Sequence, residues 1–181
     1  CAFCAFYRDL PSSEGYVLSK EELARKIEET IALGGRQVLL QGGLHPDLGI
    51  EFYEGLFRWM KETYPIWIHG LSPAEVQHVA RVSKLTVEES LRRLMAAGLD
   101  SIPGGGAEIL SDRVRKILGI AKGSTAEWLE VMETAHRLGM RTTATMMFGH
   151  VETLEERIEH LLHLRDLQDR TGGFTAFIGW T

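Results

Sequence analysis

Two cysteines stand at the start of the chain, Cys1 and Cys4, and the rest of the sequence contains no other. Thiolates are soft ligands that bind iron–sulfur clusters and zinc, and a C-x-x-C pair can also work as a redox dithiol. A structural zinc ion needs four ligands, and the nearest histidine, His45, lies far along the chain. The cysteines alone leave three interpretations open: part of an iron–sulfur site, half of a zinc site and a redox pair.

Glycines and polar side chains form a second group of candidates, because they gather where predicted strands end. Glycine lets a backbone turn sharply or approach a ligand closely, and exposed N–H groups can hold an anion. Histidine can accept a proton near neutral pH. The strand-end segments read Gln41-Gly-Gly-Leu-His45-Pro-Asp47, His69-Gly-Leu-Ser72, Pro103-Gly-Gly-Gly-Ala-Glu108, Gly149-His150-Val-Glu152 and Gly179-Trp180.

Four of these residues are the predicted catalytic candidates: His45, His69, His150 and Glu108. Each also has a plainer interpretation. A single histidine at a strand end more often holds a loop by hydrogen bonds, and Glu108 suits the first turn of a following helix, where the helix dipole favours a carboxylate. The histidines together with Asp47 also fit a metal-dependent hydrolase, but the sequence lacks the adjacent His-x-His of many such sites, and the cysteines would have no role.

The elements that must position these residues alternate between strands and helices. Capping boxes at Ser19, Thr86 and Ser124, each with Glu three residues later, start three of the helices. The predicted helices cover 19–33, 50–63, 86–97, 124–138 and 153–169, and the predicted strands cover 37–41, 66–69, 99–102, 142–147 and 174–181. The residues expected to point inward are Phe52, Tyr53, Leu56, Phe57 and Met60 in the second helix and Leu154, Ile158, Leu161, Leu162 and Leu164 in the last.

Strands that alternate with helices of ten or more residues indicate an α/β fold with parallel strands and crossover helices. Two architectures fit, an open doubly wound sheet and a (β/α) barrel. No G-x-G-x-x-G follows the first strand, which removes the main signature of a dinucleotide-binding sheet. In a barrel the strand ends would face one mouth, where active sites lie. Because a full barrel has about 250 residues, we expect a partial TIM-type barrel that lacks its first strand and its last βα units.

Composition excludes several classes of function. Hydrophobic residues make up 44% of the 181 residues, as in ordinary globular domains. No apolar run approaches the roughly 20 residues of a membrane span, so no membrane insertion is expected. The formal net charge is -5 and the basic residues are scattered, which argues against nucleic acid as a partner. Two closely spaced cysteines do not suggest a disulfide scaffold, so a reducing, cytoplasmic setting is expected.

Most of the candidate residues above lie in longer stretches that resemble a known family. The stretches CAFCAFYR, VLLQGGLHPDL, AGLDSIPGGGAEIL, STAEWLEVMETAHRLGMRTTATMMFGHVET and HLLHLRDLQDRTGGFTAFI resemble cyclic dehypoxanthine futalosine synthase, a radical S-adenosylmethionine (SAM) cyclase of menaquinone biosynthesis by the futalosine pathway. The aromatic Phe3 directly before Cys4 is also how the radical SAM motif C-x-x-x-C-x-aromatic-C ends. Aminofutalosine synthase and the deazaflavin (FO) synthase halves are sister families that share parts of these stretches.

The resemblance implies a cofactor set and its residues. Cys1 and Cys4 would be two of three thiolate ligands of a [4Fe-4S] cluster, and the third cysteine is expected upstream of Cys1. SAM would bind the open iron. The residues implied to contact these cofactors are Phe3, Gln41, Gly42, Gly43, Gly104, Gly105, Glu108, His150 and Glu152. Leu44 stands where many radical SAM enzymes carry an acid after the Gly-Gly turn, and Gly179 replaces an expected proline. Glu152 could instead cap the following helix with Thr153.

The resemblance also implies a reaction. The reduced cluster would split SAM into methionine and a 5'-deoxyadenosyl radical, and that radical would take a hydrogen atom from the ribose of dehypoxanthine futalosine. The carbon radical would add to the benzoate ring and close a spiro ring system, with loss of an electron and a proton. Reduced flavodoxin or ferredoxin is the implied electron donor, and the proton acceptor is sought among His45, His69, His150 and Glu108. The alternatives are a sister radical SAM reaction and, outside the class, a zinc or redox C-x-x-C module.

Overall fold

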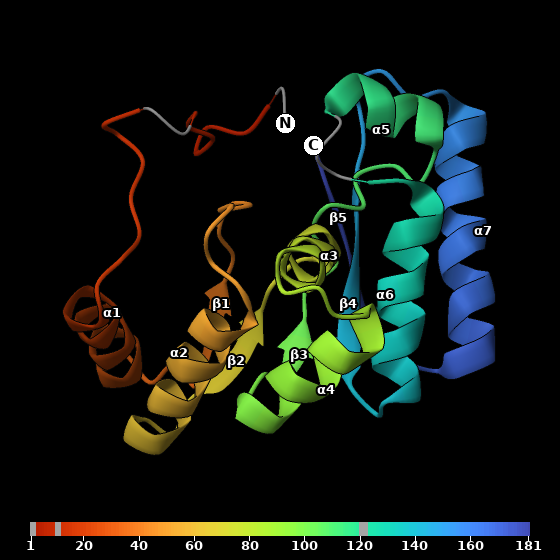
Figure 1. Cartoon of the computed structure of the whole chain (residues 1–181). Coiled ribbons are helices and arrows are strands. Elements are labelled where there is room, and N and C mark those ends of the chain that lie inside the picture. The colour runs from red at the N-terminus through yellow and green to blue at the C-terminus, as the bar shows by residue number, and fades with distance from the viewer. Residues whose placement is uncertain (1–2, 10–11, 120–122) are drawn as a thin grey trace.

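The computed structural model describes residues 3–9, 12–119 and 123–181 and contains one sheet of parallel strands with helices between them (Figure 1). The strands are β1 (Gln37–Leu40), β2 (Trp67–Gly70), β3 (Ser101–Ile102), β4 (Arg141–Met147) and β5 (Phe174–Trp180). The helices are α1 (Lys20–Ala32), α2 (Ile50–Thr63), α3 (Pro73–Val82), α4 (Val87–Ala97), α5 (Asp112–Leu118), α6 (Thr125–Arg137) and α7 (Leu154–Thr171).

The order of the strands decides between the two predicted architectures. The strands pair in sequence order, β1-β2-β3-β4-β5, and every pair is parallel. A doubly wound sheet reverses its strand order at a switch point, whereas a barrel adds each strand next to the previous one. The described residues therefore form part of a (β/α) barrel, and the partial TIM-type fold predicted from the sequence is confirmed.

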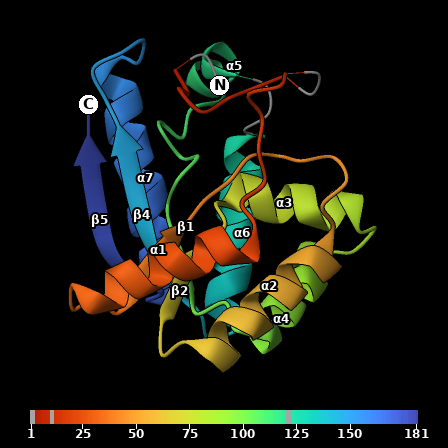
Figure 2. The same ribbon diagram turned by 90° about the vertical axis from the view of Figure 1, so that its left-hand side faces the viewer.

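Parallel strands place all their carboxyl ends on the same side of the sheet. Figure 2 shows β4 and β5 running in one direction, with α5 and the N-terminal segment beyond their carboxyl ends. We call this side of the molecule, with the loops that follow the strands, the mouth. The strand-end segments picked out in the sequence lie in or next to these loops, so the fold gathers them as predicted.

The hydrophobic core lies between the helices and one face of the sheet. Its largest fully buried side chains include Phe57 of α2, Ile68 of β2, Leu94 of α4 and Trp128 of α6. Apolar stripes at helical spacing bury against alternating strand residues, which is the pattern of a layered α/β fold. Among the described residues, none of the helices has the length and apolar character needed to cross a bilayer.

Two helices were not predicted from the sequence. Helix α3 begins after Ser72, which forms a capping box with Glu75, and it has Pro73 in its first turn. Both are helix-start signals that the sequence carried. Helix α5 is short and its N-cap, Ser111, makes no side-chain capping bond, so no comparable signal announced it.

Some side chains predicted to point inward do not. Phe52 of α2 is 38% exposed, because it lies at the edge of the face formed by Tyr53, Leu56, Phe57 and Met60. On α7 only one of the five expected residues, Leu164, is buried; Leu154, Ile158, Leu161 and Leu162 are exposed. The buried face of α7 runs through His160, Leu164 and Leu167. Because that stripe contains a polar histidine, the sequence favoured the other apolar face of the helix as the buried one.

Candidate functional site

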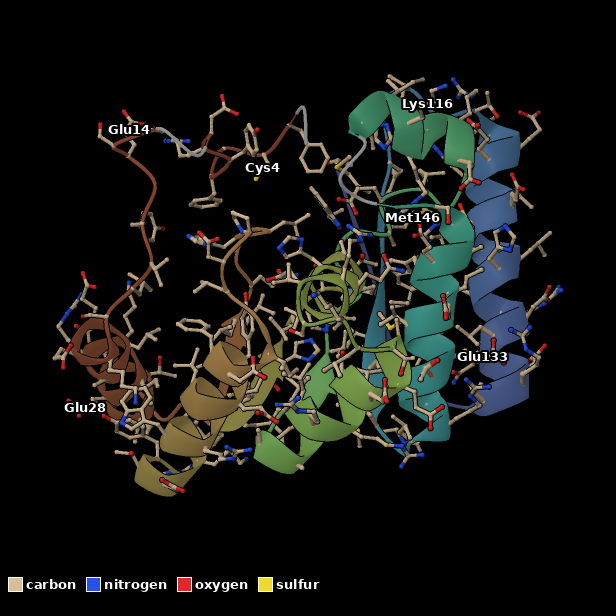
Figure 3. The ribbon with its side chains drawn as sticks, in the orientation of Figure 1. Cys4, Glu14, Glu28, Lys116, Glu133 and Met146 are labelled. Atoms are coloured by element: carbon tan, nitrogen blue, oxygen red, sulfur yellow. The ribbon has the colours of Figure 1, made fainter. Side chains whose placement is uncertain are left out.

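The cysteine segment lies at the mouth. Cys4 is exposed and carries a free thiol, while Cys1 lies outside the described residues. Figure 3 shows Cys4 on the same side of the molecule as Lys116 of α5, and Glu28 and Glu133 toward the opposite side. The ring of Phe3 packs edge-on against Trp180 at the end of β5, with their centroids 6.3 Å apart. The segment therefore reaches from its place before α1 to the far strand of the sheet.

Away from the cysteine segment, the described residues contain no ready-made metal site. Within residues 3–9, 12–119 and 123–181, no group of three or more His, Cys, Asp or Glu side chains could hold a metal ion. The zinc and hydrolase interpretations therefore have no preformed ligand set in this part of the chain. An exposed thiol at the mouth instead offers a soft ligand, which is the donor chemistry of an iron–sulfur cluster.

The turn after β1 is held by the carboxylate of Glu75, which belongs to helix α3. The Gly42 N–H donates to Glu75 Oε1 at 2.8 Å. The other oxygen, Oε2, accepts from the Ser72 N–H and the Ser72 hydroxyl, each at 2.7 Å. Glu75 is only 4% exposed, and this burial raises the pKa of its carboxyl group, although the three hydrogen bonds oppose the rise. Sequence reasoning missed Glu75, although its capping box was visible.

The glycine loop after β3, residues 103–106, contacts both β4 and the turn after β1. The Gly104 N–H donates to the Thr143 hydroxyl at 3.1 Å, and the Thr145 hydroxyl donates to the Gly104 carbonyl at 2.7 Å. A Cβ on Gly104 would lie 2.6 Å from the Thr145 nitrogen, and a Cβ on Gly105 would lie 2.5 Å from Gln41 Nε2. Only glycine lets this loop lie against β4 on one side and Gln41 on the other.

Glu108 follows the glycine loop and is buried. Its backbone has a φ of 44°, its side chain is 4% exposed, and its carbonyl accepts from the Met147 N–H at 3.0 Å. Helix α5 starts only at Asp112, so the alternative that placed Glu108 in a first helical turn is wrong. Its charge acts on the buried guanidinium of Arg115, which donates to the carbonyls of Gly106 and Ala107 at 2.7 and 2.9 Å. No sequence signal distinguished Arg115.

The loop after β4 is organised by Glu152. The side chain of Glu152 is fully buried and accepts from the backbone N–H groups of Gly149 at 2.6 Å and His150 at 2.9 Å. Arg157 pairs with the same carboxylate at 2.6 Å. Burial alone would raise the pKa of Glu152, but these N–H groups and Arg157 lower it to about 2. The alternative in which Glu152 caps α7 is wrong, because Thr153 forms that capping box with Glu156.

His150 is held within this loop. Its Nε2 lies 3.0 Å from the Met147 carbonyl, so Nε2 carries a proton and donates it. Its Nδ1 lies 3.3 Å from Glu152 Oε2 and is buried without a hydrogen-bond partner. The structure therefore brings His150 and Glu152 together, as expected from their positions in the sequence. Hydrogen bonds within the loop hold both residues in place.

His69 is the candidate that lies within the sheet. Ser101 Oγ is 2.9 Å from Trp67 Nε1 and 2.7 Å from His69 Nδ1. An indole N–H can only donate, so the serine oxygen accepts from Trp67, and it shares a second hydrogen bond with His69 Nδ1 whose direction depends on the imidazole tautomer. Burial lowers the pKa of His69, which favours a neutral imidazole.

His45 belongs to the loop after β1 and is half-buried. The Asp47 N–H donates to His45 Nδ1 at 3.2 Å, and His78 Nε2 of α3 donates to the His45 carbonyl at 2.8 Å. These bonds fold the loop toward α3. The structure thus connects the turn after β1 with α3 and the glycine loop, and connects that loop with β4.

Comparisons with known proteins place this geometry in a family. A family model described as the Radical SAM superfamily matches residues 1–164. The chain is 52% identical over 179 residues to 5-amino-6-(D-ribitylamino)uracil--L-tyrosine 4-hydroxyphenyl transferase 1 of Methanosarcina mazei, covering 98% of the chain and 46% of that protein. It is 50% identical over 183 residues to cyclic dehypoxanthine futalosine synthase of Streptomyces coelicolor, covering 100% and 46%.

A cyclic dehypoxanthine futalosine synthase of Halalkalibacterium halodurans is 51% identical over 181 residues, covering 99% of the chain and 49% of that protein. The chain thus spans about half the length of these curated relatives. Radical SAM enzymes use a [4Fe-4S] cluster and SAM, and the exposed Cys4 thiol at the mouth fits the first of these. With parallel strands in barrel order and a family match over most of its length, the chain belongs to the radical SAM superfamily.

Proposed function

We propose that the protein is a radical SAM cyclase that converts dehypoxanthine futalosine to cyclic dehypoxanthine futalosine in menaquinone biosynthesis. The observation that carries this proposal is the identity of 50% and 51% to two bacterial proteins of that name, over nearly the whole chain. The residues 1–181 would be one radical SAM core domain of a longer protein, completed by a first strand and further βα units.

The cofactor site would use the residues already gathered at the mouth. Cys1 and Cys4, with a third cysteine, would hold the cluster, and Phe3 would shield it against Trp180. When bound, the cluster and SAM together supply a 5'-deoxyadenosyl radical that takes a hydrogen atom from the substrate ribose. The chain itself binds, orients and excludes water, which is the usual share of the protein in cofactor chemistry.

Two loops would orient SAM. The backbone carbonyls of Gln41, Gly42 and Gly43 would bind the amino group of its methionine part, since carbonyl oxygens accept hydrogen bonds from the amino N–H groups. Gly104 and Gly105 would let SAM approach the backbone closely, and Glu108 would accept from ribose hydroxyls. The loop with His150 and Glu152 would support the adenine from the side of β4. The tight packing of Gly104 on β4 and of Gly105 near Gln41 supports a fixed relation between these loops.

The last step needs a group that accepts a proton, and four residues are proposed for it: His45, His69, His150 and Glu108. Their hydrogen bonds differ. His45 accepts a hydrogen bond at Nδ1, so a base role at its Nε2 requires the ring proton to move to Nδ1 first. Replacement of each of the four residues in turn by a non-titrating residue tests this proposal. Unchanged turnover in all four variants would exclude all of them as the proton acceptor.

A second function is favoured by one specific observation. The Methanosarcina mazei relative, at 52% identity, is named as a transferase of a 4-hydroxyphenyl group from tyrosine. An FO synthase-type reaction of this kind is therefore the main alternative, and aminofutalosine synthase is another within the class. Identity to the two kinds of relative is nearly equal, so the products must distinguish them.

The partners beyond the small-molecule substrate follow from the same proposal. Reduced flavodoxin or ferredoxin would be the electron donor, and the setting would be the cytoplasm, where a cluster and free thiols persist. Neither nucleic acid nor a membrane is proposed as a partner.

The deciding experiment uses the full-length protein, reconstituted without oxygen and supplied with SAM and a reductant. Dehypoxanthine futalosine is given in one reaction, and tyrosine with 5-amino-6-(D-ribitylamino)uracil in another. Mass spectrometry of a cyclised product lacking two hydrogens, beside 5'-deoxyadenosine, supports the cyclase. A 4-hydroxyphenyl adduct in the second reaction supports the transferase instead. Neither product, in protein with an intact cluster, contradicts both.

A further inference from the structure

Every backbone carbonyl from Gly104 to Glu108 accepts a hydrogen bond from another part of the chain. The donors, in the order of the carbonyls, are the Thr145 hydroxyl at 2.7 Å, the Trp128 indole at 3.4 Å, the Arg115 guanidinium at 2.7 and 2.9 Å, and the Met147 N–H at 3.0 Å. Because β3 lies between β2 and β4, this segment is not at an open edge of the sheet. The fold therefore fixes the segment at every peptide, although glycines alone would leave it mobile.

Glu108 is the residue of this segment that most needs such support. Its φ of 44° lies in the left-handed region, which a residue with a Cβ adopts only at a cost in free energy. The carbonyls on both sides of its Cα are held, that of Ala107 by Arg115 and its own by the Met147 N–H. A strained backbone persists where its surroundings impose it, and such residues gather at ligand-binding sites.

Arg115 of α5 contributes more to this support than a single hydrogen bond. Its Nη1 binds the carbonyls of Gly106 and Ala107, and its Nε binds the Gly123 carbonyl at 2.9 Å. The residue is 2% exposed, and this burial lowers the pKa of its guanidinium, while the negative charge of Glu108 opposes the lowering. The guanidinium thus fixes the backbone before Glu108 and also attracts the Glu108 carboxylate.

We propose that Arg115 is a positioning residue for SAM: it holds Glu108 in the conformation in which the carboxylate accepts hydrogen bonds from the ribose hydroxyls. Arg115 acts through Glu108, because its guanidinium is buried and binds backbone carbonyls. This inference rests on the proposed contact between Glu108 and the ribose. It gives the short helix α5 a task in ligand binding, since α5 carries the arginine that fixes the segment before it.

The test measures binding rather than turnover, in full-length protein with its cluster. Dissociation constants for SAM are determined by calorimetry for the wild type, Glu108→Gln, Arg115→Lys and the double variant. Arg115→Lys keeps the positive charge but loses the planar guanidinium, which reaches several carbonyls at once. The matched control is Arg92→Lys, because Arg92 is exposed and pairs with Glu88 within α4.

We expect Glu108→Gln and Arg115→Lys each to weaken SAM binding by about tenfold. The double variant should bind SAM no more weakly than Glu108→Gln, because the contact that Arg115 serves is already lost. Arg92→Lys should bind SAM as the wild type does. A general structural role of Arg115 would instead weaken binding again in the double variant, since independent losses add in free energy.

Unchanged binding by Arg115→Lys, or a second loss of the same size in the double variant, overturns the inference. Unchanged binding by Glu108→Gln removes the ribose contact and overturns the inference with it. In each case SAM binding by the wild type leaves the proposed function intact, whereas wild-type protein with an intact cluster that binds no SAM contradicts that function itself. Should Arg115→Lys not fold, a crystal structure of the wild type with SAM decides. We expect Glu108 within hydrogen-bond distance of the ribose and Arg115 still bound to the Gly106 and Ala107 carbonyls, and a ribose bound elsewhere overturns the inference.

Discussion

Glu75 and Glu152 are both buried glutamates that fix a strand-end loop by accepting backbone N–H groups, yet their surroundings differ. Glu152 lies in the loop it organises, after β4, and Arg157 neutralises it at 2.6 Å. Glu75 reaches the turn after β1 from helix α3 and has no cationic partner among the described residues. Burial raises the pKa of Glu75, whereas the N–H groups and Arg157 bring the pKa of Glu152 down to about 2.

The difference separates the mouth into two parts with different tasks. On the β4 side the buried carboxylate of Glu152 is paired with Arg157. On the β1–β2 side the buried carboxylate of Glu75 has no cationic partner among the described residues. Strained or unpaired groups of this kind persist where a ligand completes them. We therefore expect substitutions on the β4 side to reduce stability, and those on the β1–β2 side to reduce ligand binding.

The largest expected effect comes from removing the counterion of Glu152, which would leave an unpaired buried carboxylate on the β4 side as on the β1–β2 side. Arg157→Met removes the counterion of the buried Glu152 and should destabilise the full-length protein by about 3 kcal/mol. Arg92→Met is the control, because its pair with Glu88 is exposed and worth less than about 1 kcal/mol. Denaturant unfolding of both variants measures the effect. Equal midpoints for Arg157→Met and wild type would show that Glu152 does not need its counterion.

Two neighbouring glycines test the boundary between the two sides. In Gly104→Ala the new Cβ would meet the backbone of β4 at 2.6 Å, and a backbone cannot move aside, so we expect a loss of about 2 kcal/mol. In Gly105→Ala the new Cβ would meet the flexible end of Gln41, which can turn away. Gly105→Ala should therefore be stable and bind SAM more weakly. A reversed order of stabilities would mean that the loop is not anchored to β4.

The two carboxylates should also respond to pH with opposite signs. Glu152, with a lowered pKa, stabilises the fold above its unfolded value of about 4.5, and this contribution is lost as pH falls from there toward about 2. Glu75, with a raised pKa, binds its proton more tightly when folded, so its contribution falls as pH rises above about 4.5.

The variants Glu152→Gln and Glu75→Gln separate these contributions when unfolding midpoints are measured against pH. Glu152→Gln should lose less stability than wild type as the solution becomes acidic. Glu75→Gln should gain on wild type as pH rises. The same sign of change for both variants would remove the distinction between the two sides.

The smallest expected effect concerns Ser101, which connects β2 and β3. Ser101→Ala removes the acceptor for Trp67 and the hydrogen-bond partner of His69 Nδ1, at a cost of about 1 kcal/mol. It also releases His69 to carry its proton on either ring nitrogen. Nitrogen-15 shifts of His69 should show one tautomer in wild type and a mixture in the variant. A mixture of tautomers already present in wild type would contradict this role of Ser101.

Much of the fold followed from local signals in the sequence. Ser19, Thr86 and Ser124 marked helix starts correctly through their capping boxes, and the alternation of strands and helices indicated an α/β fold with parallel strands. The face of α7 was wrong because two apolar stripes compete on that helix and the buried one includes His160. Local periodicity does not state which stripe meets the sheet.

The site was predictable only in part, because its key contacts join distant segments. Gly42 and the strand-end histidines could be picked out from residue type and position. Glu75 and Glu89 look alike in the sequence, since both complete a capping box, and only the register of β1 against β2 brings one of them to Gly42. The role of Ser101 between Trp67 and His69 depends on the register of β2 against β3.

The most direct test of this division of the mouth is a crystal structure of the full-length protein, prepared without oxygen, with its cluster and SAM. The account predicts the SAM amino group within hydrogen-bond distance of the backbone carbonyls of Gln41, Gly42 and Gly43, with Glu75 still bound to the Gly42 N–H. It also predicts that the loop with Gly149, His150 and Glu152 keeps its hydrogen bonds unchanged. A SAM amino group held by the β4 loop, or a Glu75 side chain turned away from Gly42, would contradict it.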